Sequence, residues 1–180
     1  MIYVFLANGF EEVEALTPVD ILRRAGKQVI TVGIGSQIIK GSHGISVVTD
    51  TDDGQLVLND EIEMIVLPGG MPGTLNLEAN KTVQDAIDFC VSNDKYIAAI
   101  CAAPSILGHK GLLIGRSATC FPGFEDELKG AEYSSDLVVT DGKIITAKGA
   151  GAAMKFALKL TEILCSKEKA DSLEASLQCR

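Results

Sequence analysis

The chain has 180 residues, which is enough for one domain with a substantial core and short for two independent domains. We therefore expect residues 1–180 to form a single domain. The 16 basic and 24 acidic residues give a net charge of -8, and no lysine- or arginine-rich run offsets it. A phosphate backbone would be repelled, so nucleic acid is not expected as a partner.

Neither a membrane span nor a secretory leader is expected at the start of the chain. Residues 1–7 are apolar, but Glu11 and Glu12 follow too soon for either segment. The five cysteines include no C-x-x-C spacing, and the only histidines are His43 and His109, so neither a disulfide framework nor a zinc site is indicated. We expect reduced thiols, a cytoplasmic location, no metal and no membrane contact.

Short apolar runs alternate with longer helical patterns, as expected for βαβ units around a mostly parallel sheet. Strands are predicted at residues 1–7, 28–32, 64–67 and 96–100, and helices at residues 10–25, around 83–91 and at 104–109. Two antiparallel hairpins are predicted, over residues 37–48 and over residues 137–147 with the turn at Asp141-Gly142. One last long helix is expected from about residue 151 to a point before Cys179.

The candidate chemistry gathers at Cys101, where the predicted strand 96–100 ends and the chain turns into a helix. Ligands of open α/β sheets bind at the carboxyl ends of strands. The following helix offers unpaired N–H groups and the positive end of its dipole, so we expect the thiolate to be favoured over the thiol. The competing interpretation is a buried cysteine that packs as a small apolar residue. Because Cys101 lies at the turn, the two interpretations are about equally supported.

An acidic partner for this thiol is predicted in the first helix. One stripe of that helix, apolar apart from one carboxylate, consists of Phe10, Glu14, Pro18, Ile21 and Ala25. Burial raises the pKa of a carboxyl group, which suits Glu14 to proton transfer, whereas the alternative is a solvated glutamate. Glu11 and Glu12 lie off the stripe, and the helix dipole is sufficient to explain them. Leu16 and Val19 lie on other sides, so we expect both the sheet and a second subunit to cover this helix.

The Gly69-Gly70 loop follows a predicted strand and could present backbone N–H groups to a developing oxyanion. The alternative is an ordinary flexible turn. No P-loop is present, and the glycines at residues 149–151 lack the third member of a dinucleotide fingerprint, so no nucleotide cofactor is expected. His109 follows Cys101 at a helical distance of about 12 Å, which makes it a poor general base.

Several motifs together resemble the ThiJ/PfpI superfamily, in the branch of the Parkinson-associated protein deglycase. They are LANGFEEVE at residues 6–14, PVD and RRAG within 18–26, VLPGG at 66–70, AAICAAP at 98–104 and TAKG at 146–149. The resemblance implies an α/β, flavodoxin-like three-layer sandwich with a mostly parallel central sheet, similar to class I glutamine amidotransferases, and a homodimer. It also implies that Cys101 is an elbow nucleophile hydrogen-bonded to Glu14, with oxyanion donors at the backbone of Gly70 and Ala102.

Three positions depart from the family pattern. Ala102 follows Cys101 where protease-like members carry histidine, which disfavours peptidase activity. Phe121 stands where the deglycase branch has a pocket histidine, and a phenyl ring cannot move a proton. His43 replaces an arginine that relatives extend toward the site of the partner subunit; it is either a substitute for that arginine or an exposed loop histidine.

Two functions of different classes follow from the resemblance. The first is a cofactor-independent glyoxalase or deglycase, in which Cys101 attacks methylglyoxal-type dicarbonyls, free or as early adducts on proteins, and Glu14 relays the proton. The second is a redox sensor or holdase chaperone of the oxidative-stress response, in which Cys101 is oxidised to a sulfinic acid beside a protonated Glu14. The missing histidine at Phe121 favours the second function relative to efficient catalysis.

Overall fold

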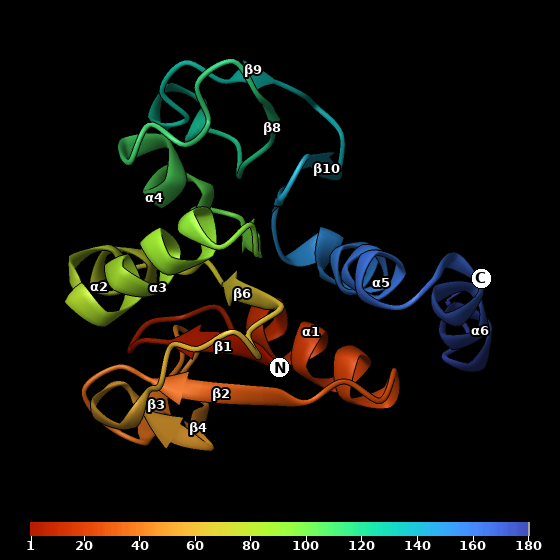
Figure 1. Ribbon diagram of the computed structural model, residues 1–180, viewed down its shortest axis with the longest axis horizontal. Helices are drawn as coiled ribbons and strands as arrows, with labels where there is room; N and C mark the ends of the chain where they lie inside the picture. The colour runs from red at the N-terminus through yellow and green to blue at the C-terminus, as the bar shows by residue number, and fades with distance from the viewer. Residues whose placement is uncertain (180) are drawn as a thin grey trace.

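The computed structural model describes residues 1–179 and contains a seven-stranded central sheet between two layers of helices (Figure 1). The strand order is β10-β11-β7-β6-β1-β2-β5, and every neighbouring pair is parallel except β10 with β11. The strands are β1 (Ile2–Leu6), β2 (Val29–Gly33), β5 (Thr51–Asp52), β6 (Met64–Leu67), β7 (Tyr96–Ile100), β10 (Val138–Asp141) and β11 (Ile144–Ala147). The predicted α/β sandwich with a mostly parallel sheet is confirmed.

The two helical layers cover opposite faces of the sheet (Figure 1). One face packs against α1 (Glu12–Arg24) and α5 (Ala153–Leu164), and the other against α2 (Gly73–Ala79), α3 (Lys81–Ser92) and α4 (Pro104–His109). Side chains of β1 alternate between the faces, because successive residues of a strand point in opposite directions. Val4 belongs to the core beneath α1, whereas Phe5 belongs to the core on the other side.

Both predicted hairpins are present. The first pairs β3 (Ile38–Lys40) with β4 (Ser46–Val48), and the second pairs β10 with β11. The turn of the second hairpin is Gly142-Lys143, one residue later than predicted, because Asp141 still pairs with Ile144; Gly142 has a positive φ of 58°. The remaining short elements are β8 (Ser117–Ala118), β9 (Glu132–Tyr133), η1 (Asp53–Gln55), η2 (Glu125–Glu127) and η3 (Ala150–Ala152). Within residues 1–179, no helix combines the length and apolar character needed to cross a membrane.

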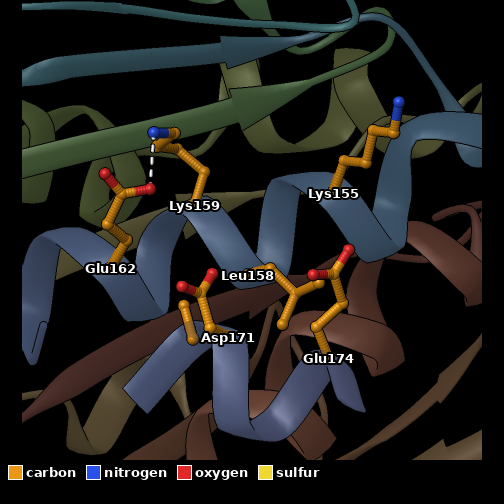
Figure 2. A pocket seen from close by; sticks show the side chains of 7 residues that line it. Lys155, Leu158, Lys159, Glu162, Asp171 and Glu174 are labelled. Atoms are coloured by element: carbon orange, nitrogen blue, oxygen red, sulfur yellow. Dashed lines mark hydrogen bonds and ion pairs between the residues drawn. The ribbon is translucent and has the colours of Figure 1, made fainter. Parts of the chain in front are cut away.

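The prediction of one long C-terminal helix is wrong. Helix α5 ends at Leu164, and a separate helix, α6 (Lys167–Ser176), begins after Ser166. Ser166 has extended backbone angles and its hydroxyl accepts a bond from the N–H of Lys169 at 3.2 Å, so it caps α6. Figure 2 shows α6 lying against α5 with Leu158 between them; the hollow there has a volume of about 260 Å³ and is lined by neither Cys101 nor Glu14.

Candidate active site at Cys101

Cys101 lies in a sharp turn between β7 and α4, with a positive φ of 65°. This conformation costs a residue with a side chain about 1–3 kcal/mol, so the surrounding bonds must hold it in place. The Cys101 N–H donates to the carbonyl of Ala147 at 2.9 Å, and its carbonyl accepts from the N–H of Phe121 at 2.8 Å. The turn projects a partly exposed thiol at the carboxyl end of the sheet, as the sequence predicted.

Glu14 reaches the same point from the first turns of α1. Its side chain is only 1% exposed and is hydrogen-bonded to the Cys101 side chain. The N–H of Gly69 donates to Glu14 Oε2 at 3.0 Å, and the backbone of Ala150 contributes a further bond. Glu11 caps α1 by accepting a bond from the Glu14 N–H at 2.8 Å, which fixes the start of the helix that carries this carboxyl group. The structure therefore brings Cys101 and Glu14 into direct contact.

The two groups control each other's protonation. Burial raises the pKa of Glu14 to about 7. Burial, the Glu14 charge and the Glu14 hydrogen bond raise the pKa of Cys101 to about 12, although the N–H groups of Ala102 and Gly70 act in the opposite direction. The thiol is thus favoured beside an ionised Glu14. The N–H of Ala102, which precedes α4, does act toward the thiolate, as expected, but burial and Glu14 outweigh it, so the expected net preference for the thiolate is not met. Transfer of the thiol proton to Glu14 removes the repulsion, so formation of the thiolate is coupled to protonation of this carboxyl.

The glycines of the loop after β6 make room for this contact. A Cβ on Gly69 would lie 2.6 Å from the Cys101 Cβ and 2.7 Å from Glu14 Oε2, distances at which no side chain fits. Gly70 has a positive φ of 89°, and a Cβ there would lie 2.4 Å from the Glu11 nitrogen. The N–H groups of Gly70 and Ala102 both reach the Cys101 sulfur. Two backbone donors therefore converge where an oxyanion on a sulfur-bound carbon would form.

Phe121 forms part of the surroundings of this pair and is 46% exposed. Its ring atoms Cδ2 and Cε2 lie 3.1 and 3.6 Å from the position that a Cβ on Gly149 would occupy, and Glu14 Oε1 lies 3.9 Å from that position. The ring and the carboxyl group therefore both border the space that the missing side chain of Gly149 leaves open. Phe121 supplies an apolar surface and no proton donor or acceptor at this point.

His43 is bound within its own chain. Its side chain is 71% exposed, and Nδ1 lies 2.9 Å from Oε2 of Glu12. Burial would raise the pKa of Glu12, but hydrogen bonds from the His43 ring and from the backbone at His43 and Ile45 lower it to about 2. The dipole explanation given for Glu12 is therefore insufficient, because this buried carboxylate holds residues 42–45 against α1.

Among the described residues, one cluster brings together three side chains of the kinds that bind metal ions. Glu11, Glu12 and His43 bring possible ligand atoms within 4.8 Å of one another. However, Glu12 already accepts bonds from the Ser42 hydroxyl and from two backbone N–H groups, and Glu11 caps α1. These hydrogen bonds give both carboxylates a structural role, so a metal ion is not needed to explain the cluster.

Comparison with known proteins shows the family to which this chain belongs. Residues 1–163 match the DJ-1/PfpI family. The chain belongs to this family. It is 38% identical over 177 residues to Protein dj-1beta of Drosophila melanogaster, covering 97% of this chain and 94% of that protein. It is 34% identical over 165 residues to Glutathione-independent glyoxalase DJR-1.2 of Caenorhabditis elegans, covering 91% and 87%. The structure described as Toxoplasma gondii DJ-1, oxidized, has a TM-score of 0.90 and 33% identity, with coverage of 98% and 97%.

The sequence interpretation of this DJ-1/PfpI protein missed two contributors to the site. The Gly149-Ala150 segment after β11 supports Glu14 and receives the Phe121 ring, and Glu12 anchors the loop that carries His43. The TAKG motif, which ends at Gly149, was the available signal for the first. His109 is bound to Glu78 and, at 2.8 Å, to Glu127, so it takes no part in the site.

Proposed function

We propose that the protein is a cofactor-independent glyoxalase or deglycase that converts methylglyoxal-type 2-oxoaldehydes, free or as early adducts on proteins, into 2-hydroxy acids. The observation that carries the proposal is the contact of the Cys101 sulfur with the Glu14 carboxyl and with the N–H groups of Gly70 and Ala102. A nucleophile, an acid/base group and two oxyanion donors thus meet at one atom. The glyoxalase named among the relatives supports the same chemistry.

The first step makes a hemithioacetal. Glu14 accepts the proton of the Cys101 thiol, and the thiolate attacks the aldehyde carbon to form a C–S bond. The electron pair of the carbonyl bond moves to oxygen, where the N–H groups of Gly70 and Ala102 stabilise the charge until Glu14 returns the proton. The raised pKa of Glu14, about 7, allows the carboxyl group to act as base and acid in turn near neutral pH.

The second step transfers hydrogen within the substrate. Glu14 removes the proton from the sulfur-bound carbon, the electron pair forms a C=C bond as the carbonyl pair moves to the keto oxygen, and Glu14 delivers the proton to that oxygen, so an enediol forms. The hydroxyl on the sulfur-bound carbon then loses its proton to Glu14, which passes it to the former keto carbon, and a thioester of the 2-hydroxy acid results. One substrate carbon is oxidised and its neighbour is reduced, so no external oxidant or reductant is needed. Water then attacks the thioester, the C–S bond breaks, and the thiol of Cys101 is regenerated.

Formation of lactate from methylglyoxal by the purified protein tests this proposal. We expect lactate to accumulate in the absence of glutathione and added metal, at a rate proportional to protein concentration. Loss of methylglyoxal without a hydroxy acid product would contradict the proposal, because simple adduct formation on surface lysines also consumes the aldehyde. Assay of a glycated peptide in parallel tests whether protein adducts are substrates.

A redox sensor, with signalling or holdase activity as its output, is the second candidate for the same sulfur. A protonated Glu14 can donate a hydrogen bond to a sulfinate oxygen, and one solved relative is described as oxidised. The reaction consumes two hydrogen peroxide molecules, places two oxygens on sulfur and releases two waters. Mild peroxide is expected to add two oxygens to Cys101 first, as measured by peptide mass spectrometry. Cys165 and Cys179 are more exposed, so their earlier oxidation would contradict selective reactivity.

We also propose a homodimer formed through an apolar face of α1. A hollow of about 420 Å³ there is lined in part by Val13, Leu16, Ile45 and Met154. Light scattering is expected to give about 38 kDa, twice the chain mass of 19.0 kDa.

The Val13→Asp variant is expected to be monomeric, because it places a charge in this apolar interface. Val91 on α3 is 50% exposed, as is Val13, so Val91→Asp is a matched control that remains dimeric; equal masses for the two variants would contradict this interface.

A cytoplasmic location is part of the proposal. All five cysteines are free thiols. Reduced thiols in this number suit a reducing compartment, whereas secreted domains pair their cysteines.

A further inference from the structure

The Phe121 ring is positioned by backbone bonds rather than by burial of its side chain. Its N–H donates to the carbonyl of Cys101 at 2.8 Å, and its carbonyl accepts from the N–H of Phe124 at 3.1 Å. The segment is therefore tied directly to the turn that carries the nucleophile. Phe121 as a whole residue nevertheless remains 46% exposed to solvent. Phe5, Phe10 and Phe156 are fully buried, so this ring differs from those that build the core.

The exposed ring and the reacting groups occupy neighbouring positions. Phe121 and Glu14 both approach Gly149, each with an atom within 4 Å of the point where a Cβ on Gly149 would lie. Glu14 in turn contacts the Cys101 sulfur. A substrate whose aldehyde carbon is bound to that sulfur, and whose adjacent carbon is within reach of Glu14, therefore has its remaining substituent near the Phe121 ring.

The chemistry of this surface favours an apolar substituent. The polar groups at the sulfur, from Gly70, Ala102 and Glu14, are directed at the reacting atoms. A phenyl ring offers neither donor nor acceptor to the rest of the substrate. A methyl substituent covers little of the ring, whereas an aryl substituent removes both apolar surfaces from water and can stack on it.

We infer that Phe121 makes this site selective for 2-oxoaldehydes with a large apolar substituent, of the aryl glyoxal class, over those with a methyl group. The inference rests on the proposed function, because it concerns the substrate of the same Cys101 site. Phe121 acts as a binding surface that determines specificity and takes no part in proton transfer. The contact of two aromatic rings corresponds to a change of about three- to tenfold in selectivity.

The test compares kcat/KM for phenylglyoxal and methylglyoxal, measured as mandelate and lactate. The ratio of the two values is expected to fall about three- to tenfold in Phe121→Ala, mainly through KM for phenylglyoxal. Phe121→Tyr keeps the ring, so its ratio is expected to stay within about twofold of the native protein. Val91→Ala, which removes an exposed apolar side chain from α3, is the matched control and is expected to leave the ratio unchanged.

The outcomes separate this inference from the proposed function. Turnover of both aldehydes with the same ratio in Phe121→Ala and in the native protein would overturn the inference alone. An equal fall in Phe121→Tyr and Phe121→Ala would also overturn it, because the ring would then not be the determinant. Absence of both hydroxy acids from reactions of the native protein would overturn the proposed function, and the inference with it.

Discussion

Replacement of Cys101 by serine is expected to lower kcat/KM for lactate formation by at least about 10³-fold. The serine hydroxyl has nearly the same size and can accept the same backbone N–H bonds from Gly70 and Ala102. Its proton, however, is held far more tightly than that of a thiol, and Glu14 with a pKa of about 7 is too weak a base to remove it. The thioester intermediate also cannot form without sulfur.

The control for this variant is Cys165→Ser. Cys165 is exposed at the end of α5, so its loss removes a reactive thiol without touching the turn at Cys101. We expect this control to retain the native rate of lactate formation. An unchanged rate in Cys101→Ser would exclude covalent catalysis by this sulfur. An equal loss of rate in both variants would indicate that the reaction depends on thiols in general.

Glu14→Gln is expected to lower kcat/KM by about 10²- to 10⁴-fold, because the amide can neither accept the thiol proton nor move the substrate hydrogen. The native protein is expected to gain activity as pH rises through about 7, where the Cys101 and Glu14 pair loses the first of its two protons. Below that pH both groups are protonated and no base is available. The step near pH 7 is expected to be absent in Glu14→Gln, and its persistence would assign it to another group.

The thermal stability of Glu14→Gln shows whether its loss of activity comes from the missing carboxyl group or from a damaged fold. Burial raises the pKa of Glu14 above its usual 4.5, so the folded state binds this proton more tightly than the unfolded state does. The carboxyl group therefore contributes stability at low pH that is lost as pH rises through about 7. Glutamine carries no such ionisation, and we expect Glu14→Gln to unfold at a higher temperature than the native protein at pH 8. A lower unfolding temperature would mean that the activity loss reflects damage to the fold.

The sequence by itself determined most of the secondary structure, because the relevant signals are local. Apolar runs predicted β6 and β7 at the residues where they occur, and Pro104 indicated the start of α4. The Asp141-Gly142 pair predicted the hairpin of β10 and β11, with its turn one residue too early. The C-terminal helix was the exception. Its helical periodicity continues across Cys165, and the cap at Ser166 that divides it was overlooked.

The sequence also singled out Cys101 and Glu14 as candidates, since a strand-to-helix turn and a carboxylate in an apolar stripe are both visible in a linear pattern. Only the tertiary structure brought the two side chains together and set their protonation. The pKa of each group depends on its burial and on the other's charge, and these arise from segments far apart in the chain. For the same reason, the sequence could not place the Phe121 ring near Glu14, because both meet at Gly149, which belongs to a third segment.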